Sequence, residues 1–198
     1  MKTMFLKNVK YILSAPSKQF WVADDRKEIC IVGRSNVGKS TFINKICNHN
    51  SLAKVSGTPG YTKYINFFDV NNTFYLVDSP GYGYAKASWT RDKSFANMMQ
   101  EYIYERPNLV CVIMIVDAKV GMTSDDYLLL DMLRDANRKV QIIASKVDKT
   151  NQSLRSAFMK KAKENLNEEE LNNLLFYSAL DNRTVDKVVE RVLSIYND

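Results

Sequence analysis

The segment GRSNVGKS, residues 33–40, carries glycines, a lysine and a serine at the spacing G-x-x-x-x-G-K-[ST]. It directly follows the apolar, strand-like run EICIVG and precedes TFINKI, which has a helical pattern, so it has the context that a phosphate-binding loop requires. Glycines allow backbone N–H groups to converge on phosphate oxygens, and the start of a helix adds a favourable dipole. The alternative, a plain turn between strand and helix, is disfavoured by this context. The segment therefore predicts a nucleotide-binding site.

Two side chains of this segment have the chemistry to act on the phosphates. Lys39 is expected to reach the β and γ phosphates and to take part in catalysis, and Ser40 is expected to ligate Mg²⁺. The predicted contacts extend over the whole loop and the residue after it, namely Gly33, Arg34, Ser35, Asn36, Val37, Gly38, Lys39, Ser40 and Thr41.

A second candidate element, DSPG, lies at the end of another strand-like run. It fits the D-x-x-G element of guanine-nucleotide switches, in which we expect Gly81 to take part in catalysis. The next residue is where many such switches carry the glutamine that orients the attacking water. Here it is Tyr82, which has no carboxamide, so the sequence leaves open how the water is positioned. The predicted nucleotide contacts of this element are Asp78, Ser79, Pro80 and Gly81.

The segment SKVD, residues 145–148, resembles the [NT]KxD element that recognises guanine. The Asp148 carboxylate accepts hydrogen bonds from guanine N1–H and the 2-amino group, whereas adenine leaves it unpaired at a cost of roughly 1.5–3 kcal/mol per lost bond. A solvated loop is the better interpretation of SKVD alone, but after a phosphate loop the balance reverses. YSAL, residues 177–180, adds a backbone contact to the guanine oxygen. The predicted base contacts are Ser145, Lys146, Val147, Asp148, Tyr177, Ser178 and Ala179.

Short apolar runs of strand length alternate with amphipathic stretches of helical period. The runs are residues 28–33, 64–70, 73–78, 109–117, 139–145 and 174–178. Asn71 and Asn72 predict a hairpin turn because asparagine tolerates positive φ, while Thr123 with Asp126 predicts a helix start. The pattern indicates a three-layer α/β fold with a mixed, mostly parallel six-stranded sheet, one antiparallel strand and helices on both faces. The ligand site of such a sheet lies at the carboxyl ends of its strands.

The composition is that of one folded domain with a basic surface. The chain has 198 residues, a net charge of +6 and a pI near 9.1, which favours an anionic partner such as nucleic acid or a membrane surface. A solvated basic face is an equally good interpretation of the charge. The longest apolar runs fall far short of the ~20 residues that span a bilayer, and a cytoplasmic protein is expected. Cys30, Cys47 and Cys111 are expected in the core, and a single histidine, His49, disfavours a zinc site.

Taken in order, GRSNVGKS, KVSGTPGYTKYINFF, DSPGYGYAK, SKVD and YSAL resemble the EngB (YsxC/YihA) family of ribosome-biogenesis GTP-binding proteins, in the TrmE-Era-EngA-EngB-like GTPase superfamily. The resemblance covers almost the whole chain. It implies a P-loop NTPase G domain at 25–198 with an N-terminal extension at 1–24 packed on it, forming a single domain. It also implies GTP, GDP and Mg²⁺ as ligands. The implied partner is the large (50S) ribosomal subunit, through rRNA and ribosomal proteins, for a monomer that binds neither DNA nor membrane.

The resemblance assigns Thr62 as the threonine that ligates Mg²⁺ when the γ-phosphate is present and that takes part in catalysis. Two residues depart from the family pattern. Ser145 stands where threonine is usual and keeps the hydroxyl with a less constrained rotamer, whereas Tyr61 replaces a basic residue and removes a possible phosphate or RNA contact. The residues placed beside the nucleotide by the resemblance are Gly60, Tyr61, Thr62, Lys63 and Tyr64.

Without a glutamine, the attacking water must be positioned by backbone groups, by a monovalent cation or by ribosomal groups. Asn36 stands where related GTPases hold a potassium ion against the phosphates, although bracing of the loop is an equal alternative. Arg34 and Arg91 are candidate arginine fingers, but exposed arginines more commonly face solvent or RNA. Intrinsic turnover is expected to be slow, on the order of 10⁻⁴ to 10⁻³ s⁻¹.

Aromatic and basic side chains interleave after DSPG and form a candidate RNA-contact surface, because they can stack on bases and neutralise phosphates. Packing of these aromatic rings on the core is the equal alternative. The leading functional hypothesis is a GTPase switch on the maturing large subunit. The alternatives are a GTP-gated ribosome- or RNA-binding module with incidental hydrolysis, and an ATP-using kinase, against which Asp148 argues. The candidate surface comprises Tyr82, Tyr84, Lys86, Trp89, Arg91 and Lys93.

Overall fold

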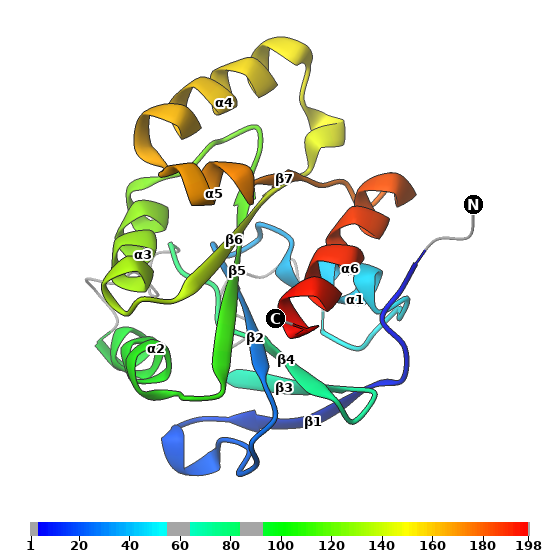
Figure 1. Cartoon of the computed structure of the whole chain (residues 1–198), viewed down its shortest axis with the longest axis vertical. Coiled ribbons are helices and arrows are strands. Elements are labelled where there is room, and N and C mark those ends of the chain that lie inside the picture. The colour runs from blue at the N-terminus through cyan, green and yellow to red at the C-terminus, as the bar shows by residue number, and fades with distance from the viewer. Residues whose placement is uncertain (1–3, 55–63, 84–92, 198) are drawn as a thin grey trace.

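One mixed sheet forms the centre of the molecule (Figure 1). The computed structural model describes residues 4–54, 64–83 and 93–197, the first three residues of the last range by their backbone only. The strands lie in the order β1-β3-β4-β2-β5-β6-β7. Strand β3 runs antiparallel to both of its neighbours, and the other pairs are parallel. The strands are β1 (Val9–Ala15), β2 (Glu28–Gly33), β3 (Ile65–Val70), β4 (Phe74–Asp78), β5 (Leu109–Asp117), β6 (Lys139–Ser145) and β7 (Leu175–Phe176).

Helices cover both faces of this sheet (Figure 1). Successive residues of a strand point to opposite faces, so Ile29 and Ile31 of β2 pack in the cluster that contains α1 and α6. Cys30 and Val32 pack on the other side, in the cluster that contains α2, α3 and α4. None of the helices in the described ranges is long and apolar enough to cross a membrane. The helices are α1 (Lys39–Ile46), α2 (Lys93–Glu105), α3 (Ser124–Asp135), α4 (Gln152–Asn165), α5 (Glu168–Asn172) and α6 (Asn182–Asn197), with short 3₁₀ turns η1 (Lys18–Phe20) and η2 (Val147–Lys149).

The three-layer α/β fold predicted from the sequence is confirmed, with β3 as the one antiparallel strand. The sheet has seven strands rather than six, because residues 9–15 add β1 beside β3. Sequence patterning missed β1 because it lies at the sheet edge and most of its side chains are at least partly exposed. It also missed α5, whose five residues include three glutamates and form no apolar stripe.

Local start and stop signals behave as predicted. Asn71 and Asn72 have φ values of 53° and 57°, and the Thr73 N–H donates to the Val70 carbonyl at 2.9 Å, which closes the hairpin turn. Thr123 caps α3, and its backbone N–H donates to the Asp126 carboxylate at 2.7 Å. The three cysteines are buried, free thiols in the core. These features set the register of β3 against β4 and fix where α3 begins.

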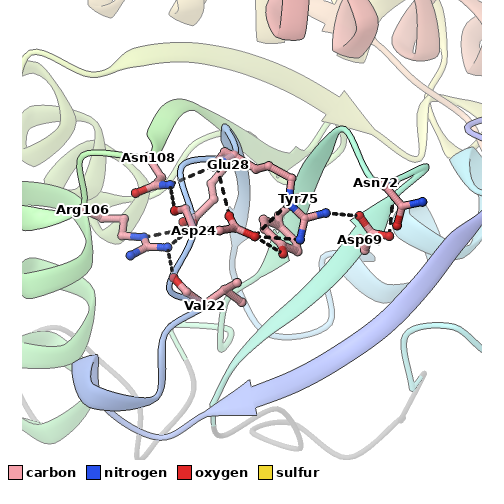
Figure 2. Close-up of polar contacts among 9 residues, drawn as sticks. Val22, Asp24, Glu28, Asp69, Asn72, Tyr75, Arg106 and Asn108 are labelled. Carbon is pink, nitrogen blue, oxygen red and sulfur yellow. Dashed lines mark hydrogen bonds and ion pairs between the residues drawn. The ribbon is translucent and has the colours of Figure 1, made fainter.

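A polar network anchors the N-terminal segment to the sheet at the end of β2 opposite Gly33 (Figure 2). Glu28 is fully buried and accepts hydrogen bonds from Arg106 Nε at 2.9 Å and from the Tyr102 hydroxyl at 2.6 Å. Arg106 also donates to the Val22 carbonyl at 2.7 Å. The network therefore ties the chain before β2 to the end of α2. The assignment of residues 1–24 as a distinct extension stays a prediction.

Replacing Arg106 by leucine is expected to lower the free energy of unfolding by about 3–5 kcal/mol, because the buried Glu28 carboxylate loses its cation. Denaturant titration followed by circular dichroism measures this change. Arg183→Leu breaks an exposed pair with Asp181 and is the matched control, expected to leave the midpoint close to that of the parent chain. Equally small shifts in both variants would contradict the role assigned to the network.

Candidate functional site

The loop between β2 and α1 lies at the carboxyl ends of the parallel strands, where the sequence predicted a phosphate site. Its first glycine is required by close packing, because a Cβ on Gly33 would lie 2.6 Å from the Ile115 carbonyl oxygen of β5. Its second glycine, Gly38, has φ of 110° and precedes the first residue of α1. Close packing at Gly33 and the positive φ of Gly38 both disfavour a side chain. The loop therefore has the form of an anion-binding turn at a helix N-terminus.

The Lys39 ammonium lies under this loop and is buried. Its Nζ donates to the Gly33 carbonyl at 2.9 Å and to the Arg34 carbonyl at 3.3 Å. Burial lowers the pKa of Lys39, and the negative charge of Asp78 opposes this shift. A buried cation held by loop carbonyls can stabilise the negative charge of bound phosphates.

Asp78 ends β4 next to Lys39 and is almost fully buried. Its Oδ1 atom has no hydrogen-bond partner in the described part of the chain. Burial raises the pKa of Asp78 to about 6, against the lowering effects of Lys39 and Asn66. A buried carboxylate oxygen without a partner is energetically costly, and a cation or its bound water would remove that cost. With the Ser40 hydroxyl at the start of α1, the donor set suits Mg²⁺, which prefers oxygen ligands.

The segment after β4 lies directly against the phosphate loop. The Ser35 N–H donates to the Tyr82 carbonyl at 2.8 Å, and Ser35 Oγ donates to the Gly81 carbonyl at 3.2 Å. A Cβ on Gly81 would lie 2.9 Å from both Lys39 Nζ and Ser35 N. Pro80 and Ser79 are buried, and the Ser79 hydroxyl donates to the Ile31 carbonyl at 3.0 Å. The end of the DSPG element thus lies on the phosphate loop, and its contact with a nucleotide stays a prediction.

Tyr82 does not lie on a surface, which corrects its place in the candidate RNA-contact surface. Its side chain is 1% exposed, and its hydroxyl donates to Asp126 Oδ1 of α3 at 2.7 Å. Burial and the neighbouring Asp126 charge raise the pKa of the Tyr82 phenol well above its ordinary value, so the phenol stays protonated and can donate. The Tyr82 ring packs on the core, as the alternative interpretation predicted, and its hydroxyl is hydrogen-bonded to α3.

The predicted base loop is joined to the phosphate loop by two side chains. Ser145 Oγ donates to the Val37 carbonyl at 3.3 Å and to the Val116 carbonyl at 3.0 Å, so the serine retains a useful hydroxyl contact. Lys146 has φ of 58°, and its Nζ donates to the Asn36 carbonyl at 3.1 Å and pairs with Asp117 at 3.0 Å. The two loops therefore form one connected unit.

Asp148 projects from this unit into solvent and is oriented by a neighbouring loop. The Ser178 hydroxyl donates to Asp148 Oδ1 at 2.6 Å, and the Val147 N–H donates to the Tyr177 carbonyl at 3.3 Å. The Leu180 N–H in turn donates to the Ser178 hydroxyl at 3.1 Å. One carboxylate oxygen is held and the other remains available to a base. Ala179, between these residues, is partly exposed.

The remaining predicted residues differ in exposure or lie outside the described ranges. Thr41 and Tyr64 are exposed, as is Asn36, whereas Arg34 is partly buried. The side chain of Lys93 is not described. The predicted residues outside the described ranges are Gly60, Tyr61, Thr62, Lys63, Tyr84, Lys86, Trp89 and Arg91.

Sequence reasoning missed Asp117 as part of the site. It ends β5, accepts the Lys119 N–H at 2.9 Å and pairs with Lys146. Burial is the largest influence on Asp117 and by itself raises its pKa, but the hydrogen bond and charge of Lys146, together with the backbone N–H groups of Lys119 and Val120, outweigh it and leave the pKa lowered. Its signal in the sequence was an acidic residue closing a strand beside the phosphate loop. Asp126 was found only as a helix cap, and nothing in its spacing pointed to Tyr82.

A doubly wound sheet, a phosphate loop with a buried lysine, a D-x-x-G segment lying on that loop and an aspartate joined to it define the class of phosphate-loop GTPases. Residues 28–146 match the family described as "50S ribosome-binding GTPase". A "Probable GTP-binding protein EngB" from Clostridium kluyveri is 41% identical over 197 residues, which cover 98% of this chain and 100% of the relative. Another from Mycoplasma capricolum subsp. capricolum is 40% identical over 94% of this chain and 96% of the relative. The chain belongs to the 50S ribosome-binding GTPase family, among its EngB members, and is a GTPase.

Solved structures share the fold. The crystal structure of a probable GTP-binding protein engB superposes with a TM-score of 0.68 at 19% identity, over 86% of this chain and 98% of that chain. The structure of Era in complex with MgGDPNP and nucleotides 1506–1542 of 16S ribosomal RNA gives a TM-score of 0.65 at 20% identity, over 87% of this chain and 57% of that chain. At these identities the likeness concerns the fold alone.

Proposed function

We propose that this chain is a Mg²⁺-dependent GTP switch that acts in assembly of the large ribosomal subunit. The observation that carries the guanine-nucleotide part is the geometry around Asp148, which is oriented by Ser178 in a loop joined to the phosphate loop. The family description, which names 50S ribosome binding, supports the partner. The net charge of +6 suits ribosomal RNA, and Era has been solved with a fragment of 16S ribosomal RNA.

Guanine is proposed to bind at Asp148, between the SKVD and YSAL segments. Ser178 donates to Oδ1, so Oδ2 faces the base and accepts from guanine N1–H and the 2-amino group. Adenine presents an acceptor at N1, which repels the carboxylate and leaves it unpaired. This arrangement supports selectivity for guanine nucleotides and speaks against the ATP-using kinase. Ser145 and Lys146 hold the base loop at a fixed place relative to the phosphates.

The phosphates are proposed to bind in the loop from Gly33 to Thr41, with Lys39 neutralising their charge. Mg²⁺, when bound, neutralises the charge that develops on the transferred phosphoryl group. The residues that would hold it are Ser40 and, through water, Asp78, whose unpaired Oδ1 supports this assignment. Thr62, outside the described ranges, is proposed as the further ligand that responds to the γ-phosphate.

We propose that the side chain at position 82 does not position the attacking water during catalysis. The Tyr82 phenol is engaged with α3 through its bond to Asp126, and it carries no carboxamide. Backbone groups of Gly81 and Thr62 are the remaining candidates in the chain. A potassium ion held by Asn36 would supply positive charge there, which is supported by the exposure of Asn36 on the loop. Slow intrinsic turnover follows from the missing carboxamide.

Asp148→Asn is expected to lower GDP affinity by about 100-fold or more, because two charge-assisted hydrogen bonds are lost. The asparagine carbonyl takes the place of Oδ1 and accepts from Ser178, so its amide nitrogen faces the base and can donate to the 2-oxo group of xanthosine diphosphate. Calorimetric titration with both nucleotides measures the switch in preference. Asp131→Asn, an exposed carboxylate on α3, is the control. Retention of GDP preference by Asp148→Asn would contradict the assigned base site.

Turnover of GTP with and without purified large subunits tests the proposed partner. The proposal predicts a rise in turnover with large subunits but not with small subunits, because the partner completes the site that Tyr82 leaves without a carboxamide. The same assay in potassium and sodium buffers tests the cation, and equal rates would reject a role for potassium. Binding to large subunits with no rise in turnover would instead favour the GTP-gated binding module.

A further inference from the structure

The backbone of Gly81 occupies the space next to the Lys39 ammonium. A single added carbon on Gly81 would lie 2.9 Å from Lys39 Nζ and 2.9 Å from both the N and Cα atoms of Ser35, closer than real contacts allow. A phosphoryl group is much larger than a methyl group. A phosphate that approaches Lys39 from this side therefore requires Gly81 to move away from the loop.

Hydrogen bonds hold Gly81 and Tyr82 in this place. The Ser35 N–H and hydroxyl donate to the carbonyls of Tyr82 and Gly81, at 2.8 Å and 3.2 Å. Arg34 and Tyr82 form a β-bridge between the two segments. The next residue, Gly83, has φ of 76°, a conformation that favours glycine. Backbone interactions therefore hold Gly81 and Tyr82 against the phosphate loop.

The side chain of Tyr82 adds a second attachment, to α3. Its hydroxyl donates to Asp126 Oδ1 at 2.7 Å, and Asp126 is fully buried. Asp126 Oδ2 accepts from the backbone N–H and the hydroxyl of Thr123, at 2.7 Å and 2.8 Å, so the carboxylate is itself fixed by the start of the helix. Moving Tyr82 outward would leave a buried charge with one fewer donor, which is unfavourable. We call Ser35, Gly81, Tyr82 and Asp126 the Tyr82 latch.

We propose that the Tyr82 latch sets the balance between GDP and GTP by holding Gly81 where the γ-phosphate must lie, with Asp126 as the positioning residue. The proposal rests on the proposed function, since it concerns the same nucleotide site. GDP has no γ-phosphate and binds with the latch closed. GTP must open it, so its apparent affinity is reduced by the fraction of molecules in which the latch is open. In this proposal Tyr82 does not position the attacking water. Instead, it controls when the segment around Gly81 can move to contact the γ-phosphate.

Tyr82→Phe removes the bond to Asp126 and keeps the ring in the core. The ratio of the dissociation constant of the GTP analogue guanosine 5′-(β,γ-imido)triphosphate to that of GDP is expected to fall about 5- to 10-fold, with Mg²⁺ present. Asp126→Ala should shift the ratio in the same direction, and the double variant should add little, because either change removes the same Tyr82–Asp126 bond.

Tyr102→Phe is the matched control. Tyr102 is a fully buried tyrosine that donates to a fully buried carboxylate, Glu28, at 2.6 Å and lies away from the phosphate loop. It loses an equivalent bond, so a general loss of stability would affect it equally, yet its nucleotide ratio should stay within about 2-fold of the parent chain. An unchanged ratio in Tyr82→Phe, with both nucleotides bound, would overturn the latch. Failure of the parent chain to bind either nucleotide would instead overturn the proposed function.

Amide hydrogen exchange on the unaltered chain tests the latch without a variant that must fold. Tyr82 is buried and forms the β-bridge with Arg34 when the latch is closed, so its amide is expected to exchange faster with the GTP analogue than with GDP at the same saturation. Identical exchange of the Tyr82 amide in the two complexes would overturn the latch.

Discussion

The buried ammonium of Lys39 is the constraint on which the rest of the site depends. A buried cation must be compensated, and here the carbonyls of Gly33 and Arg34 and the charge of Asp78 do so. These partners lie at the end of β2, on the phosphate loop and at the end of β4. Compensating one charge therefore brings two strand ends and a helix start together. Bound phosphates would add to the same compensation rather than create it.

Two further elements are joined to this centre by hydrogen bonds of defined direction. The base loop donates to it through Ser145 and Lys146, so Asp148 stands at a set distance from the phosphate loop. The segment after β4 accepts from it through Tyr82, which is also bonded to α3. The loop proposed to recognise the base and the segment proposed to respond to the γ-phosphate are thus both attached to the phosphate loop. This arrangement supports the proposed switch, in which one nucleotide contacts both attachments.

Most of the fold and of the candidate site could be predicted because the signals are local. The phosphate loop, Asp78 and SKVD each follow an apolar run directly, and parallel strands gather their carboxyl ends at one edge. The bond from Tyr82 to Asp126 joins residues 44 apart and depends on how α3 packs, which spacing does not encode. Asp117 was missed because its partner, Lys146, lies on another strand end. Strand β1 was missed because an exposed edge strand lacks a clear alternation.

The central claim is that this loop cluster is a guanine-nucleotide site, and calorimetric titration of the full chain with GDP and with ADP in Mg²⁺ buffer tests it most directly. The two nucleotides have the same phosphates, so any difference reports on the base. The account predicts that GDP binds at least about 100-fold more tightly than ADP, since ADP leaves the Asp148 carboxylate without two donors. Equal affinities would contradict the account, because the phosphate loop would then act without the base loop joined to it.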